Sequence, residues 1–371
     1  MKKHGNHSVL RWSALLLISV LILGTFLLSA FAAETAETRY TTDGGATWTE
    51  ATFKDALAAG VAAEKTTIEL LGNYTLSQVF TVTGGDITIK SIDGQTYTVT
   101  KSTESEGDIF TVSGGAKITL ANIKFEGGGK WSSPLGSLFR LSTKDDTVIL
   151  ESGTTVNGFY VNGSGSVVNA PNGYVEMKDG VTITNCTAKY SGGAFSIGVA
   201  SGTGEGAVLN MTGGTISGCA VNNLSNGVHT GSAVAVFKNA TFNMSGGLIT
   251  NCESLRTSAA SSHATGAIID GAVGMKDGPH TVTISGDAVI RDNRAYRWNG
   301  TDKELSSGAD VVHNRGYQNA ASLVIAKDFT GSIGAANAYS VATTAAETVA
   351  FATAGEGWNA GDIIHGVIDN N

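Results

Sequence analysis

Short alternations of apolar and polar residues recur along most of the chain. One clear group consists of three runs, at residues 233–237, 241–244 and 248–250. Each run alternates apolar residues with small or polar ones and ends at a Gly, Asn or Ser-Gly turn, the pattern of a short, half-buried β-strand. No helical run of about ten residues separates these strands, which argues against βαβ units.

This three-strand unit repeats. The segments 177–186, 211–219 and 244–252 share a Met-x-Gly-Gly-like turn followed by an Ile, and they end in three cysteines spaced by 33 and 33 residues. Strands this short cannot bury a face alone, so we expect the units to stack as coils. About eight coils with the ~4.8 Å strand spacing predict a rod on the order of 40 Å long. A propeller is the alternative, but its blades need four longer antiparallel strands per repeat. One apolar position runs through all the coils, at Ile89, Leu120, Leu150, Met177, Met211, Met244, Ile284 and Ile325.

These repeats, the Gly-Gly-Ala strand at residues 192–194 and the segment 328–334 resemble right-handed parallel β-helix proteins of the pectin-lyase-like superfamily. The likeness is closest to the repetitive adhesin-like proteins of bacteria, and it covers about residues 66–334. It implies an all-β fold, a right-handed parallel β-helix solenoid of about eight coils. Lyases, hydrolases and binding rods share this scaffold, so the resemblance does not choose an activity.

The segments before and after the coils show different patterns. Phe53, Leu57 and Val61 have helical spacing and predict a short amphipathic helix that caps the stack. Before it, residues 41–48 resemble the Asp-box turn of sialidase propellers, which we interpret as a hairpin in the cap. We therefore expect an N-terminal cap at 33–65, the β-helix at 66–334, and at 335–371 a C-terminal tail or an incomplete or truncated cap.

The N-terminal 32 residues have the features of a secretory signal peptide. Lys2, Lys3 and Arg11 precede an apolar run from 12 to 31, and Ala30-Phe31-Ala32 offers a small-x-small cleavage site. The alternative is an uncleaved membrane anchor, because the run is nearly long enough to span a bilayer. The sequence thus predicts a secreted, extracellular or cell-surface-associated protein, with membrane contact only through this segment if it is uncleaved.

Composition narrows the classes further. The 371 residues are 42% apolar and 15% charged, which excludes a disordered chain and an all-membrane chain. The 49 glycines are consistent with many tight turns, and the presence of only 3 prolines excludes collagen and proline-rich stalks. The formal charge of −8 provides no overall attraction to nucleic acid, so we expect no nucleic-acid partner.

Cys186, Cys219 and Cys252 occupy one position of successive coils, where the neighbouring coils place Phe159 and Asn293. We interpret them as an inward-facing ladder of buried thiols. Parallel stacked side chains do not converge on a tetrahedral metal, so we expect no metal site. Adjacent rungs lie within the Cα separation that a disulfide tolerates, which leaves open a bond between two of the three.

Candidate catalytic groups are scattered. Asp292 has no acidic partner in neighbouring coils, Asp287 aligns with turn glycines, and the Asp145-Asp146 pair falls in a turn. Glycoside hydrolysis requires acidic groups within about 5 to 10 Å of one another, and a lyase requires a base beside a calcium-binding acidic cluster. We therefore name no catalytic residue and no cofactor, and favour a protein that is not an enzyme.

The connections after the third strand vary most, and we expect them to project as loops from one edge of the rod. Loops on a rigid scaffold commonly carry binding groups, aromatic faces stack on sugar rings, and cations attract acidic glycans. The sequence predicts a structural or binding role with a polysaccharide, a surface glycan or a surface protein as partner. Two alternatives remain, that these residues only cover the flank of the rod, or that the protein is a polysaccharide lyase or glycoside hydrolase with an unrecognised site. The variable connections are 127–137, 187–192, 220–231, 253–265 and 294–307, and the predicted binding residues are Trp131, Tyr190, Tyr296, Arg297 and Trp298.

Overall fold

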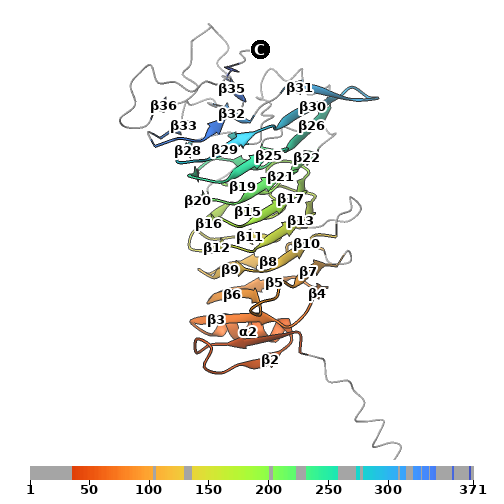
Figure 1. Cartoon of the computed structure of the whole chain (residues 1–371), viewed down its shortest axis with the longest axis vertical. Helices are drawn as coiled ribbons and strands as arrows, with labels where there is room; N and C mark the ends of the chain where they lie inside the picture. The colour runs from red at the N-terminus through yellow and green to blue at the C-terminus, as the bar shows by residue number, and fades with distance from the viewer. Residues whose placement is uncertain are drawn as a thin grey trace, which may run out of the picture.

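Short strands in four sheets make up most of the part of the protein that the structure describes (Figure 1). The computed structural model describes residues 36–102, 106–128, 136–199, 204–222, 231–257, 273–275, 279–307, 310–314, 321–326, 328–333, 335–339, 353–354 and 367–368. The predicted signal segment 1–32 lies outside them. Among the described helices, none has the length and apolar character needed to cross a membrane.

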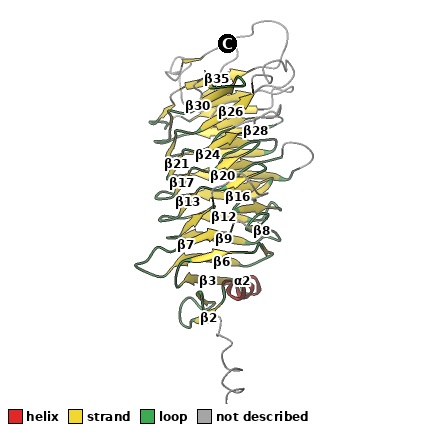
Figure 2. Cartoon of the chain, turned by 90° about the vertical axis from the view of Figure 1, so that its right-hand side faces the viewer, coloured by secondary structure: helices red, strands yellow, loops and turns green. Residues whose placement is uncertain are grey.

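The largest sheet of the described chain has 12 strands, and Figure 2 shows its labelled strands stacked along the length of the molecule. β1 pairs antiparallel with both β2 and β3, and from β3 onward each strand pairs parallel with the strand of the next repeat. In spatial order the strands are β2 (Thr49–Ala51), β1 (Thr38–Thr41), β3 (Lys65–Leu70), β6 (Asp86–Ser91), β9 (Lys117–Ala121), β12 (Thr147–Leu150), β16 (Asn172–Met177), β20 (Gly206–Met211), β24 (Ala240–Met244), β28 (His280–Ile284), β33 (Ala321–Ile325) and β36 (Thr353–Ala354).

Two further sheets are parallel throughout. The described part of one has 9 strands: β4 (Tyr74–Leu76), β7 (Thr98–Lys101), β10 (Lys124–Glu126), β13 (Thr155–Asn157), β17 (Thr182–Thr184), β21 (Thr215–Ser217), β25 (Leu248–Thr250), β29 (Val289–Arg291) and β34 (Ser332–Ile333). The other has 10 described strands: β5 (Phe80–Val82), β8 (Phe110–Val112), β11 (Phe139–Leu141), β15 (Val168–Ala170), β19 (Phe195–Ile197), β23 (Val234–Val236), β27 (Val273–Met275), β32 (Val311–Asn314), β35 (Ala335–Tyr339) and β37 (Val367–Ile368).

The fourth sheet has 6 strands in the described chain and was not expected from the sequence. Its strands are β14 (Tyr160–Val161), β18 (Thr187–Ala188), β22 (Ala220–Asn222), β26 (Glu253–Thr257), β30 (Arg294–Trp298) and β31 (Lys303–Ser307). The chain runs through the sheets in turn, for example from β15 to β16, β17, β18 and then β19. Such long parallel sheets of short strands are consistent with a β-helix-like solenoid, and they contradict the antiparallel blades of a propeller.

The predicted apolar ladder is confirmed by the strand register. All eight of its members, from Ile89 to Ile325, pair in sequence across the 12-stranded sheet. Their side chains are buried, at most 2% exposed. A second column in the 10-stranded sheet stacks aromatic rings, with centroids 5.8 Å apart for Phe80 and Phe110 and 5.2 Å apart for Phe110 and Phe139. The core therefore consists of aligned columns of like residues.

A helix and a hairpin cover the N-terminal end of the core, as the patterns at 52–61 and 41–48 predict. Helix α2 (Phe53–Ala62) begins after Thr52, whose side chain accepts a hydrogen bond from the Asp55 backbone N–H. The turn between β1 and β2 is closed by Asp43, whose Oδ1 accepts from the backbone N–H of Thr47 at 2.9 Å. These elements cover a stack end that would otherwise expose strand edges.

Parallel pairing continues past residue 334, within the segment predicted as a tail or incomplete cap. β35 pairs with β32, β36 with β33, and β37 with β35.

Candidate binding face on the six-stranded sheet

The six-stranded sheet corrects the expectation that the variable connections start as loops. Each of the connections at 187, 220, 253 and 294 begins with a strand that pairs parallel with the same segment of a neighbouring repeat. The last connection also turns back, because β31 pairs antiparallel with β30. The predicted binding edge is therefore a sheet with an outer face, and in Figure 1 its β30–β31 hairpin projects sideways beyond the other strands.

A left-handed residue lies two positions before each of the five parallel strands and produces the corner that starts this sheet. The aligned positions have φ angles between 54° and 67°, a region that Gly and Asn enter at low cost. Asp292 aligns with asparagines and glycines because this position requires a left-handed backbone conformation. The aligned residues are Gly158, Asn185, Gly218, Asn251 and Asp292.

The residues that follow this corner form the predicted inward ladder. Cys186, Cys219 and Cys252 are fully buried free thiols, as expected for an inward column. Burial raises the pKa of Cys186 well above its ordinary value. Asn293 continues the column, where its Oδ1 accepts from the Cys252 backbone N–H at 2.9 Å and its Nδ2 donates to Asp310 Oδ1 at 2.7 Å.

Strand alternation divides the rest of the sheet into an inner and an outer face. Ala188, Val221 and Ser254 share the inward register and are buried. The outward register therefore contains one column from Tyr160 through Thr187, Ala220 and Glu253 to Arg294. A second outward column includes Asn222, Leu255 and Tyr296.

Tyr296 on β30 lies among charged groups. The Lys303 ammonium from β31 is 3.8 Å from the ring centroid of Tyr296 and forms an ion pair with Glu253 of β26. A hydrogen bond with Tyr296 also raises the pKa of Arg294. Tyr296 thus interacts with two cations on the outer face, and one of them, Lys303, is ion-paired with a carboxylate.

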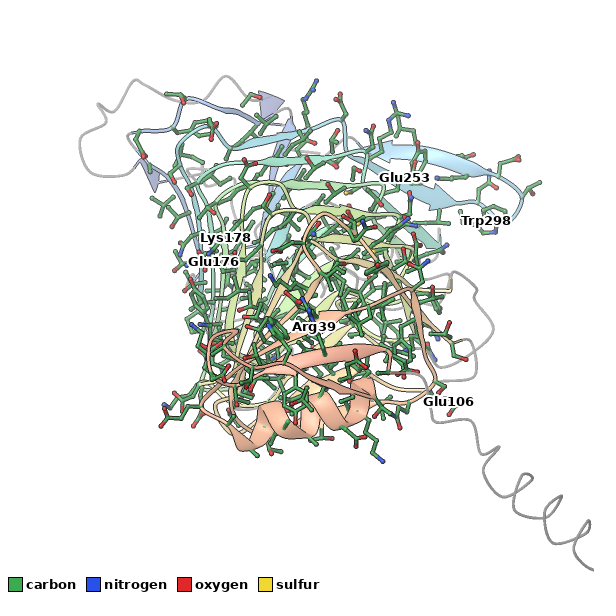
Figure 3. All side chains as sticks on the ribbon, turned by 60° about the horizontal axis from the view of Figure 1, so that its bottom comes forward. Arg39, Glu106, Glu176, Lys178, Glu253 and Trp298 are labelled. Atoms are coloured by element: carbon green, nitrogen blue, oxygen red, sulfur yellow. The ribbon has the colours of Figure 1, made fainter. Side chains whose placement is uncertain are left out.

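Apolar side chains extend this surface toward the end of the hairpin. Trp298 opposes Lys303, and Tyr296 opposes Leu305, so all four lie on the outer side of the hairpin. Leu305 is 64% exposed, the largest exposure among the described large apolar residues, and Tyr296, Trp298 and the neighbouring Leu255 are partly exposed. In Figure 3, Trp298 lies toward the end of the hairpin, and Glu253 of β26 lies nearer the body of the protein. We call Leu255, Tyr296, Trp298, Lys303 and Leu305 the hairpin patch.

A turn with its own hydrogen bonds holds the hairpin. Asn299 Oδ1 accepts from the backbone N–H groups of Thr301 at 2.8 Å and Asp302 at 2.7 Å, and Gly300 has a φ of 103°. Asn-Gly between two strands is a strong hairpin signal, so the sequence contained the information that places Lys303 and Leu305 beside Tyr296.

A second aromatic group lies at the other end of the same sheet. Tyr160 of β14 and Tyr190, which follows β18, are close enough to interact, and partial burial together with Tyr190 raises the pKa of Tyr160. Tyr190 is 42% exposed, and the Lys189 ammonium is 5.3 Å from its ring centroid. We call Tyr160, Lys189 and Tyr190 the tyrosine patch.

The structure brings some of the predicted binding residues together and separates others. Tyr296 and Trp298 share the hairpin patch, whereas Tyr190 is three strand spacings away, or about 14 Å, because β22 and β26 lie between β18 and β30. Arg297 lies in β30 by its backbone, and its side chain and the whole of Trp131 fall outside the described residues. Sequence reasoning missed Glu253, Leu255 and Leu305.

A shallow groove of about 380 Å³ lies elsewhere, at the turns between the 12-stranded and 9-stranded sheets. Two Gly-Gly turns form its floor, and Asp179 and Asp287 border it on the flanking turns. The backbones of these two aspartates are three strand spacings apart, about 14 Å, against the roughly 5 to 10 Å between the carboxyl groups of a glycoside hydrolase. The described residues contain no group of three or more His, Cys, Asp or Glu side chains placed to hold a metal ion.

The fold and this face together define an all-β protein of stacked parallel strands with an aromatic and charged outer sheet. No protein-family model, no curated protein and no solved structure matches the chain.

Proposed function

We propose that the protein is a secreted or surface-exposed, adhesin-like binding protein that holds polysaccharide or another surface glycan on the hairpin patch. The observation that carries the proposal is the outward-facing group of Tyr296, Trp298 and Leu305, with Lys303 and Glu253 among them. Aromatic faces stack on sugar rings, and the charged groups beside them provide hydrogen bonds to hydroxyl or carboxyl groups.

The finer description of the scaffold belongs to the same proposal. We propose a right-handed parallel β-helix of about eight coils, of the pectin-lyase-like type. Its support is the in-register pairing of successive repeats in each parallel sheet and the continuous apolar column from Ile89 to Ile325. A parallel crossover returns to the same sheet with right-handed geometry in nearly all proteins.

Secretion is proposed from the sequence alone. The basic residues, the apolar run and the Ala30-Phe31-Ala32 site of the first 32 residues support export. A surface location also suits the proposed ligand, since glycans are displayed outside the cell.

The proposal is tested by retention of the protein on immobilised alginate, heparin and cellulose. The variant Tyr296→Ala/Trp298→Ala should lose on the order of tenfold or more of the retained fraction on whichever matrix holds the wild type, because two stacking contacts are removed. The matched control is Trp48→Ala/Tyr174→Ala, which removes two partly exposed aromatics outside the six-stranded sheet.

Circular dichroism and the thermal midpoint should be unchanged in both variants. Retention of wild-type strength in Tyr296→Ala/Trp298→Ala, or failure of the wild type on all three matrices, would contradict the proposal. A fallen midpoint in that variant would instead assign these aromatics to packing. Assays for reducing ends and unsaturated products on the same polysaccharides test the alternative of a hydrolase or lyase.

A further inference from the structure

We infer that the ligand is an extended, acidic polysaccharide chain that lies along the long axis of the protein, across the outer face of the six-stranded sheet from the hairpin patch to the tyrosine patch. This inference rests on the proposed function and adds the class, the direction and the minimum length of the glycan. Its basis is that the hairpin patch and the tyrosine patch lie on the same sheet. The proposed function uses only the hairpin patch.

The register sets the direction of the chain. Tyr160 and Arg294 belong to the same outward column, so a line joining the two patches runs perpendicular to the strands and parallel to the stacking direction. Strands β14 and β30 are four spacings apart, about 19 Å, and β18 and β30 are three spacings apart, about 14 Å. A single sugar ring or a disaccharide is too short to contact both patches, whereas a tetrasaccharide or a longer chain spans them.

The residues between the patches leave this line open within the described strands. The column that joins Tyr160 to Arg294 presents Thr187, Ala220 and then Glu253, whose carboxylate is ion-paired with Lys303, and the other column presents Asn222. Thr and Asn offer hydrogen bonds to sugar hydroxyls, and Ala220 leaves room for a ring.

Charge favours an acidic chain. The described charged residues at outward positions of this face are Lys189, Arg294, Lys303 and Glu253, three cations and one anion, which gives a local surplus of +2 (3 − 1) on a chain of formal charge −8. Each patch contains at least one of the cations, Lys189 in the tyrosine patch and Lys303 in the hairpin patch. Carboxylated and sulfated sugars share this complementarity, and the experiment separates them.

The test measures dissociation constants of the full-length protein for size-graded alginate and heparin oligosaccharides, from disaccharide to octasaccharide, with cello-oligosaccharides as the neutral series. Affinity for one acidic series should rise by about fivefold or more between the disaccharide and the hexasaccharide, the gain from one added stacking contact. Tyr190→Ala should remove this gain and leave the disaccharide affinity unchanged, while Tyr296→Ala/Trp298→Ala should weaken every length. The series that shows the gain, alginate or heparin, identifies carboxylate or sulfate as the recognised group.

The outcomes that overturn the inference differ from those that overturn the proposed function. If the acidic chains bind and depend on Tyr296 and Trp298, but length and Tyr190 have no effect, the axial chain is wrong and the hairpin patch stands. A neutral hexasaccharide that binds as tightly as the acidic ones would refute the acidic class. If no oligosaccharide of any series binds, both the inference and the proposed function fail.

Discussion

Cys186, Cys219 and Cys252 show how one residue position acquires its chemistry from stacking. Each thiol follows a left-handed corner and points into a core with no exposed atom. Burial disfavours the thiolate, the form that reacts with electrophiles and metals. In the sequence, their regular spacing resembles that of a metal-binding or redox group of cysteines. In the structure, this spacing is a consequence of the repeat.

We expect these thiols to resist modification in the folded protein. A thiol reagent such as dithionitrobenzoate should label none of the three in native buffer and all three in denaturant, because unfolding removes the burial that suppresses the thiolate. Rapid labelling of the native protein would place them at the surface. A count of one in denaturant without reductant would show that two of them form a disulfide.

Lys101 is a second residue whose titration is set by burial. Its side chain is 2% exposed, and Nζ donates to the carbonyl oxygens of Gly107 at 2.7 Å and Gly136 at 3.4 Å. Burial lowers the pKa of Lys101 to about 8, and the charge of Asp108 opposes this shift. The folded state therefore releases this proton at lower pH than the unfolded chain does.

The consequence is a window of pH-dependent stability. Between about pH 8 and the ordinary lysine pKa of about 10.4, the unfolded chain binds more protons at this group than the folded protein does, so its contribution to the free energy of unfolding rises with pH. Urea unfolding of the wild type and of Lys101→Met at several pH values should show their difference growing across this window in favour of the wild type. A constant difference from pH 7 to 10 would refute the lowered pKa.

At the scale of elements, the strands of the large sheets were predictable and those of the six-stranded sheet were not. In the 12-stranded sheet, inward positions such as Met177, Met211 and Met244 are large and apolar, so alternation is visible in the sequence. In the six-stranded sheet the buried positions include a small residue, Ala188, and a polar one, Ser254. Its strands of two to five residues are also too short to show a periodic pattern in the sequence. These strands exist because the parallel stack supplies partners on both sides.

The left-handed corner before the six-stranded sheet should contribute to the stability of the protein. Asn251 is exposed, has a φ of 54° and precedes β26. Replacement by alanine should lower the free energy of unfolding by about 1 kcal/mol, because a Cβ in the left-handed region is strained when the side chain does not stabilise the turn.

Asn251→Gly is the matched control, since glycine adopts this conformation without strain and should unfold at nearly the wild-type denaturant midpoint. Equal losses in both variants would mean that the asparagine side chain, rather than its backbone conformation, maintains the corner.

At the scale of the whole molecule, the repeat period was sufficient to predict stacked coils, because only stacking buries strands this short. It was insufficient for the binding face. Trp298 and Leu305 become neighbours only because β31 folds back on β30, and Tyr160 joins Arg294 in one column only after five strands pair in register. Tyr296 and Trp298 were found from residue type and connection length. Glu253 and Leu255 come from the preceding repeat, so their proximity to Tyr296 depends on the register of the stack.

The most direct test of the account is a hydrogen-exchange footprint of the full-length protein with and without an alginate or heparin octasaccharide at saturating concentration. We expect slower amide exchange in β22, β26, β30 and β31, with unchanged exchange in β16 and β20 of the 12-stranded sheet. Protection confined to the 12-stranded sheet or to the groove between Asp179 and Asp287, or the same exchange pattern with and without both octasaccharides, would contradict it.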